Sequence, residues 1–183
     1  MADKPGVKRF QYSLKTLIVI VVLAAMFTGP LVYWNVVYPQ QQRERSARAA
    51  SANYLHTMGS ALSMYEGDSK RFPDFPTALL NPNYFSDAQV FVNPRFRKQD
   101  VGYIYISGST SAMPLNVVMY ENVPEELATE GRNVLLASGS VEWVAGGEFE
   151  NCIKKTENAI RAAGGNPTHI PISRADLKKR QKN

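Results

Sequence analysis

The stretch "SLKTLIVIVVLAAMFTGPLVYWNVVYP", residues 13–39, decides the architecture of this chain. An uninterrupted apolar run extends from Leu17 to Phe27, and few polar residues follow before Tyr38. The 23 residues from Thr16 to Tyr38 would form a helix of about 35 Å at ~1.5 Å per residue, enough to cross a hydrocarbon core of ~30 Å. We therefore expect a transmembrane anchor over residues 16–38.

Aliphatic side chains form most of the predicted anchor, and aromatic rings lie near its far end, where they favour the membrane–water boundary. Pro30 lacks a backbone N–H, so the helix should kink or loosen there. A cleaved signal peptide and a buried helix of a soluble protein are the alternatives. The residues assigned to the anchor are Leu17, Ile18, Val19, Ile20, Val21, Val22, Leu23, Phe27, Pro30 and Trp34.

Basic residues flank the anchor unequally. Four precede it, whereas three follow it together with one acidic residue: Lys4, Lys8, Arg9 and Lys15, then Arg43, Arg45, Arg48 and Glu44. Because positive charge is retained preferentially on the cytoplasmic side, this asymmetry favours an N-terminus inside the cell. We expect residues 1–15 to be cytoplasmic.

The net charge of +5 belongs to the two ends of the chain. Residues 40–173 hold 12 basic and 14 acidic side chains, so the central part is slightly acidic. A nucleic-acid-binding domain would concentrate Lys and Arg on its own surface, and we therefore expect no nucleic acid among the partners. The basic tail, residues 166–183, is expected to be solvated, with binding to phosphate or lipid headgroups as the alternative.

The sequence offers few ligands for a metal. Cys152 is the only cysteine and there are two histidines, which excludes an intrachain disulfide and a His/Cys zinc cluster. An acidic loop is a weak calcium candidate, but it lacks the ligand spacing of an EF-hand, and we interpret it as solvated. Its carboxylates are Glu121, Glu125, Glu126 and Glu130. We expect no cofactor.

Periodicity assigns the rest of the chain to helices and strands. Apolar residues recur at helical spacing over residues 39–67, which predicts an amphipathic stalk whose apolar stripe faces a domain core, with a partner-binding face as the alternative. A further helix is expected from Glu148 to Ala163, and Asp74 is expected to cap a short turn over 77–80. Stretches rich in β-branched and aromatic residues predict strands at 101–107, 115–121, 132–138 and 140–145.

These elements predict an α+β fold. A transmembrane helix is extended by an amphipathic helix, which packs on a small antiparallel β-sheet followed by a C-terminal helix. The small domain is assigned to residues 68–165, between the stalk and the basic tail.

The last two predicted strands meet at the hairpin turn Ser138, Gly139 and Ser140. The two serines are the obvious nucleophiles, but the chain runs from strand to strand and not into the helix of a Gly-x-Ser-x-Gly elbow. A base would have to come from His56, on the stalk, or His169, in a proline-flanked loop. We interpret the turn as architecture and expect no catalytic residues, with an anchored hydrolase as a remote alternative.

Three passages occur in a recognisable order: "RSARAASANYLHTMGSALSMYEGDSKRFPDFPTALL", "VFVNPR" and "YENVPEELATEGRNVLLASGSVEWV". They resemble the helix-to-loop passage, the Phe-x-Cys-Pro segment and the terminal hairpin of type IV pilin-like and type II secretion pseudopilin-like proteins. The likeness is to the bacterial group with a prepilin-type N-terminal helix and an H-x9-D-G segment, and it covers residues 10–145.

The resemblance implies a non-enzymatic structural or assembly subunit. Its anchor would cross the bacterial cytoplasmic (inner) membrane once and place the domain in the periplasm. Its partners would be the lipid bilayer and other membrane or pilin-like proteins, bound through the N-terminal helix in a homo- or hetero-oligomer. The alternatives are an accessory subunit of another membrane complex and a tethered binding module for an ion or polymer.

Five positions depart from the family pattern. Ser138 and Ala128 stand where the family has Asp and His, so no metal or acid–base role of those groups carries over to the turn. Asn93 replaces a Cys. Gln11 and Thr16 replace a Gly and a Glu of the prepilin-type N-terminus, so N-terminal processing and incorporation into a pilus do not follow from the resemblance.

Overall fold

The computed structural model describes residues 13–81, 83–85 and 87–180, apart from the side chains of Phe27 and of residues 178–180. The predictions about Lys4, Lys8, Arg9 and Gln11, and about the last three residues of the basic tail, lie outside this part. By its internal contacts the chain divides into two units, Met1–Glu44 and Arg45–Asn183.

The first unit is helical over its described residues. Helix α1 (Leu14–Val32) is capped by Ser13, whose Oγ accepts a hydrogen bond from the Thr16 N–H at 3.3 Å. It is followed by the π-helix η1 (Tyr33–Val37) and by α2 (Tyr38–Ser69), which continues into the second unit. Pro30 lies inside α1, which continues through it. The loosening of the helix that was predicted at Pro30 occurs one turn later instead, in the wide turns of η1.

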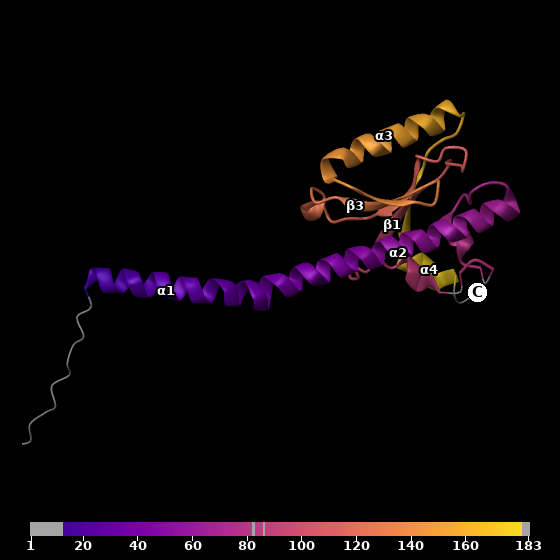
Figure 1. The fold of residues 1–183 in the computed structure, drawn as a ribbon. Coiled ribbons are helices and arrows are strands. Elements are labelled where there is room, and N and C mark those ends of the chain that lie inside the picture. The colour runs from indigo at the N-terminus through magenta and orange to yellow at the C-terminus, as the bar shows by residue number, and fades with distance from the viewer. Residues whose placement is uncertain (1–12, 82, 86, 181–183) are drawn as a thin grey trace, which may run out of the picture. The chain divides into compact units, whose positions relative to one another are not determined.

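The second unit is built on a five-stranded antiparallel sheet (Figure 1). The strand order is β4-β3-β2-β1-β5, so consecutive strands are neighbours except where β5 returns to the outside of β1. The strands are β1 (Val101–Ile106), β2 (Val117–Glu121), β3 (Arg132–Leu136), β4 (Val141–Val144) and β5 (His169–Ser173). The predicted α+β fold class is confirmed, and the four predicted strands exist with ends shifted by one or two residues.

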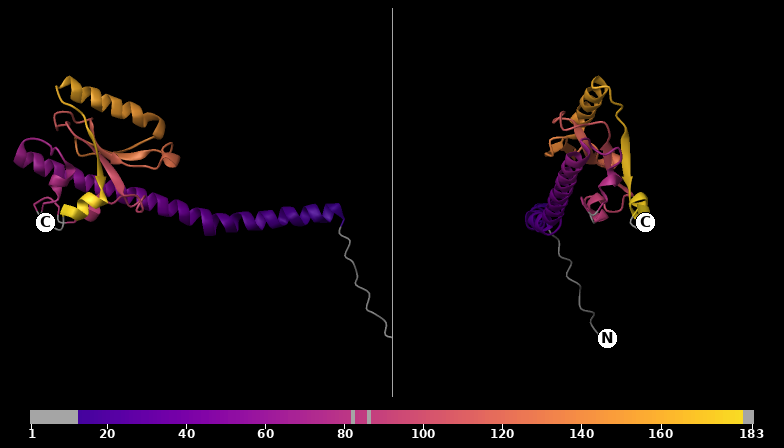
Figure 2. Two further views of the ribbon diagram at one scale, coloured as in Figure 1. Left: turned by 180° about the vertical axis from the view of Figure 1, so that it is seen from behind. Right: turned by 90° about the vertical axis from the view of Figure 1, so that its right-hand side faces the viewer.

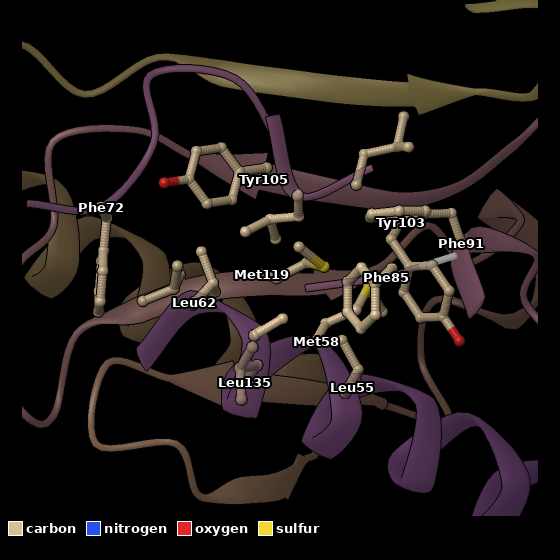
Figure 3. Packing of buried hydrophobic residues seen from close by; sticks show 14 of the residues in the cluster. Leu55, Met58, Leu62, Phe72, Phe85, Phe91, Tyr103, Tyr105, Met119 and Leu135 are labelled. Atoms are coloured by element: carbon tan, nitrogen blue, oxygen red, sulfur yellow. The ribbon is translucent and has the colours of Figure 1, made fainter. Parts of the chain in front are cut away.

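Helix α2 covers one face of this sheet. Its apolar stripe, Leu55, Met58, Ala61 and Leu62, is buried against the tyrosines of β1 and the central residues of β2 and β3 (Figure 3). Full burial of one such Leu or Met side chain contributes about 1.5–3 kcal/mol to folding, so this stripe is a major part of the core. The prediction that the stripe faces a domain core is confirmed.

Helix α3 (Gly146–Ala162) covers the opposite face (Figure 2). Ile153, Thr156 and Ile160 are its buried residues, one helical turn or two apart, which is the spacing of one face of a helix. Thr156 Oγ1 accepts a hydrogen bond from the Val117 N–H at 2.9 Å, which ties the helix to β2. The sheet is thus sandwiched between two helices, with apolar side chains on both of its faces.

Short 3-10 helices connect α2 to the sheet and β2 to β3: η2 (Pro76–Leu79), η3 (Ala88–Phe91) and η4 (Glu125–Leu127). The predicted cap at Asp74 is wrong. The residue before η2 is Phe75, which makes no side-chain cap, and the Asp74 carboxylate lies 3.5 Å from the Arg71 guanidinium instead. Pro76 at the start of the turn already supplies the required φ angle, so no cap is needed.

The C-terminal segment is not a solvated tail over its described residues. Residues 169–173 form β5, and α4 (Arg174–Arg180) follows with Leu177 only 3% exposed. His169, expected in a loop, is the first residue of this strand. The edge position allows a strand that contains Pro171, because a proline is tolerated where its nitrogen faces away from the ladder.

Pro171 indeed faces away from β1. The Ser107 N–H donates to the Thr168 carbonyl at 3.0 Å, so these two residues form a hydrogen-bonded pair. Hydrogen-bonded and non-hydrogen-bonded pairs alternate along an antiparallel ladder. Ile104 and Pro171, three pairs further along, are therefore a non-hydrogen-bonded pair. The outer edge of β5 therefore lacks a donor at its central residue.

Two tyrosines of β1 give the domain a pH limit. Tyr103 and Tyr105 are at most 1% exposed, and burial raises the pKa of both phenols far above their ordinary value of about 10. The stability that the folded state gains from these two buried, neutral phenols is therefore fully present below about pH 10. It is lost as the pH rises from there toward the pKa of the phenols in the folded state. We expect the free energy of unfolding to fall above about pH 10 by up to ~1.4 kcal/mol per pH unit for each tyrosine, as measured by urea titration. An unchanged slope in Tyr103→Phe/Tyr105→Phe would contradict this.

Candidate functional site

The predicted anchor residues gather on the surface of α1 and η1. The aliphatic side chains from Leu17 to Leu23 are 46–61% exposed, and Trp34 is 63% exposed. No Asp, Glu, Lys or Arg occurs between Lys15 and Arg43. This helix is long and apolar enough to cross a membrane, and none of its apolar window is buried, so it is not a core helix. Phe27 lies in α1, but its side chain is outside the described part.

The far end of the predicted anchor carries an aromatic cluster. The Trp34 ring lies 5.2 Å from the Tyr38 ring and 6.3 Å from the Tyr33 ring, between centroids. Such rings with polar tips are enriched at the membrane–water boundary. Asn35 donates from Nδ2 to the Leu31 carbonyl at 2.9 Å, so the helix itself satisfies this polar side chain.

The hairpin turn contributes to packing on α2. Gly139 has φ +85°, a conformation that residues other than glycine rarely adopt, and the Oγ atoms of Ser138 and Ser140 lie 2.8 Å apart. On the facing side, a Cβ added to Gly59 would lie 2.8 Å from Leu135 Cδ1 and 3.5 Å from Gly139 Cα. A helix and a turn that approach this closely leave no room for a substrate between them.

Neither histidine serves the two serines as a base. His56 is exposed on α2. His169 lies 3.0 Å from the Tyr120 hydroxyl through Nδ1 and 3.0 Å from Glu157 through Nε2. This contact joins β5 to α3 and, with Arg161, lowers the pKa of Glu157.

We expect substitutions at the turn to separate backbone effects from side-chain effects. Gly139→Ala should lower the free energy of unfolding by about 1–2 kcal/mol, because alanine is strained at this φ angle. Ser138→Ala/Ser140→Ala should cost no more than ~1 kcal/mol, since both hydroxyls are at the surface. Urea unfolding of the natural protein and the two variants measures this. A larger loss of unfolding free energy in the serine variant than in Gly139→Ala would show that the hydroxyls stabilise the turn.

The acidic loop is organised around an arginine. Arg95 Nη1 donates to Glu121 Oε2 at 3.0 Å, and its Nη2 lies 3.7 Å from Glu130 Oε2. The interpretation of Glu121 as solvated is wrong: its side chain is 0% exposed and that of Arg95 is 1% exposed. Glu125 and Glu126 are exposed on η4. No group of three or more His, Cys, Asp or Glu residues with metal-binding geometry occurs among the described residues.

Asn133 donates two further hydrogen bonds to the buried carboxylate of Glu121. Its backbone N–H donates to Glu121 Oε2 and its Nδ2 donates to Glu121 Oε1, both at 3.0 Å. The same Nδ2 donates to the Arg48 carbonyl at 3.1 Å, which links the sheet to α2. The Arg48 guanidinium in turn stacks 3.2 Å above the Trp143 ring of β4. These residues form one connected polar network, here called the Glu121 network.

Asn93 anchors the loop that carries Arg95. It is 0% exposed, and its Oδ1 accepts from the Arg95 N–H at 2.9 Å. Gly102 allows β1 to approach this loop, since a Cβ there would lie 2.8 Å from both the Asn93 nitrogen and the Phe91 carbonyl oxygen.

Sequence reasoning missed the Glu121 network. Its members come from α2, the loop after η3, and strands β2, β3 and β4. The one local signal is that Glu121 ends a run of strand residues that are otherwise apolar.

Comparison of the chain with protein-family models, with curated proteins and with solved structures gave no match.

Proposed function

We propose that this chain is a membrane-anchored, non-enzymatic structural or assembly subunit, similar to a pseudopilin. In this role α1 and η1 cross the cytoplasmic membrane of a bacterium with the N-terminus inside, and residues 45–183 are displayed in the periplasm. The observation that carries the proposal is the continuous apolar surface of α1. So large an apolar surface on a helix requires lipid or another apolar helix around it.

The second unit supports a role as a displayed module. It has its own core on both faces of the sheet, and none of the anchor side chains that the structure describes contributes to it. The serines of the turn hydrogen-bond to each other, and the buried carboxylate of Glu121 is neutralised by Arg95. The polar groups that could have supplied chemistry therefore serve packing and folding, which favours a structural role over catalysis.

Partners would bind through the anchor and through the surface of the displayed domain. A Cβ added to Gly29 would meet nothing within 4 Å, so an approaching helix could come close to the α1 backbone there. Other membrane or pilin-like proteins, in a homo- or hetero-oligomer, are the partners we propose.

Affinity purification of the full chain from detergent-solubilised membranes tests the proposal. We expect it to co-purify in a stable complex with other single-pass membrane proteins, and secretion-type components among them would support the pseudopilin-like role. Recovery of the chain from the soluble fraction after cell breakage, or as a lone monomer from the membrane, would contradict it. A different stable membrane assembly would point to an accessory subunit.

A further inference from the structure

Two basic segments that are remote in the sequence lie together in the second unit. The Arg174 N–H donates to the Asp100 carbonyl at 3.1 Å, and Ser173 Oγ donates to Asp100 Oδ2 at 2.7 Å. The Arg174 guanidinium also donates to the carbonyl of Arg97. We call residues 97–100 and 173–180, joined by these contacts, the basic junction.

The basic junction carries an excess of positive charge. By sequence it contains six basic residues against two acidic ones: Arg97, Lys98, Arg174, Lys178, Lys179 and Arg180 against Asp100 and Asp176. The side chains of the last three basic residues lie outside the described part of the chain, which shows only their position along α4. Arg97 and Lys98 are exposed. The middle of the chain is slightly acidic, so this concentration of charge stands out from the rest of the domain.

A pocket of about 480 Å³ adjoins the basic junction, lined by residues 94–99 and Pro124. Arg97, Lys98 and Phe96 are among its lining residues. Gln99 lines it as well, and its buried Oε1 has no hydrogen-bond partner in the part of the chain that the structure describes. A ligand with a negative charge would match the exposed Arg97 and Lys98 side chains of this pocket.

The chain itself keeps the basic junction within reach of the anchor. Arg48, which stacks on Trp143, follows Tyr38 by ten residues, and ten residues span at most about 35 Å. The Arg95 guanidinium carbon, in the loop that leads into the junction, lies 5.2 Å from the centre of the same Trp143 ring. The length of this connection sets only an upper limit, and it is short enough for the basic junction to reach a membrane that holds the anchor.

We propose that the basic junction binds the anionic phospholipid headgroups of the membrane in which the anchor is inserted. Headgroups such as that of phosphatidylglycerol carry a phosphate that the exposed side chains of Arg97 and Lys98 can bind. Each basic side chain near an anionic surface adds attraction, which salt screens. This inference rests on the proposed membrane anchoring, and its effect is to dock the domain on the lipid surface.

Amide hydrogen exchange on the full chain in lipid nanodiscs tests the inference. We expect exchange in residues 95–100 and 174–180 to be about tenfold slower in nanodiscs that contain phosphatidylglycerol than in phosphatidylcholine alone. This protection should disappear at about 0.5 M salt, where the Debye length falls to ~4–5 Å. Arg97→Gln/Lys98→Gln should abolish much of it, whereas Lys154→Gln/Lys155→Gln, which removes the same charge from the exposed face of α3, should not.

The outcomes separate the two proposals. Failure of the full chain to enter pure phosphatidylcholine nanodiscs would overturn the membrane anchoring on which the inference rests. Insertion without any lipid-dependent protection, or equal protection in both double variants, would overturn the lipid contact alone. Equal protection by free inorganic phosphate in phosphatidylcholine nanodiscs, or protection by RNA only, would also overturn it. Identical thermal unfolding of the two variants establishes that both are folded.

Discussion

Glu121→Ala is expected to lower the free energy of unfolding of the second unit by about 3–5 kcal/mol. The substitution leaves the Arg95 guanidinium, 1% exposed, without the carboxylate that lies 3.0 Å away. It also removes the acceptor of the buried Asn133 backbone N–H and one of the two acceptors of Asn133 Nδ2, which keeps its bond to the Arg48 carbonyl. Glu130 remains, at 3.7 Å and 53% exposed, and compensates only weakly because water screens it.

The fluorescence of Trp143 reports this unfolding directly, in a Trp34→Phe background that removes the other tryptophan. Glu126→Ala is the matched control, because Glu126 is exposed on η4 and should cost less than ~0.5 kcal/mol. Replacing both partners, as Glu121→Leu/Arg95→Met, should recover much of the loss, since an apolar pair leaves no isolated charge. A loss equal to that of Glu126→Ala would show that the pair is not buried in solution.

Val19→Arg/Val22→Arg is expected to remove the chain from the membrane. Each arginine at the centre of a transmembrane helix costs about 2.5–3.5 kcal/mol on insertion scales, and both side chains project from the apolar surface of α1. Together they make insertion unfavourable by about 5–7 kcal/mol relative to the natural anchor.

Extraction of membranes with alkaline carbonate measures the effect. The natural chain should stay in the pellet, and the double-arginine chain should appear in the supernatant or be degraded. Asn53→Arg/His56→Arg is the matched control, since it adds the same charges at the same spacing to exposed positions of α2. If the natural chain is washed off the vesicles, or the double-arginine chain stays in the pellet, α1 does not span the bilayer.

Local patterns were enough to predict most elements of this fold. The long apolar helix near the N-terminus, the stripe of α2 and helix α3 each depend on residues close together in the sequence, where hydrophobic periodicity is informative. The turn at Gly139 was predicted for the same reason, because its conformation depends on the residues of the turn itself.

Features that depend on distant partners were not predicted. Strand β5 is five residues long, contains Pro171 and pairs with a strand some sixty residues earlier, so its sequence reads as a loop. The burial of Glu121 depends on Arg95, which is 26 residues away, and on Asn133. From the sequence alone, a charged side chain is predicted to be solvated. Its burial could not be predicted here because no local sequence window contains both Glu121 and its counter-ion.

Pro171 affects how neighbouring molecules could pair along the outer edge of β5. Many copies held in one membrane reach a high local concentration, and an open strand edge under these conditions would recruit the edge of a neighbour. A strand added alongside β5 would find no N–H at its midpoint and would meet the pyrrolidine ring instead. The proline therefore disfavours strand pairing along the β5 edge, so we expect an assembly of these molecules to form through other surfaces.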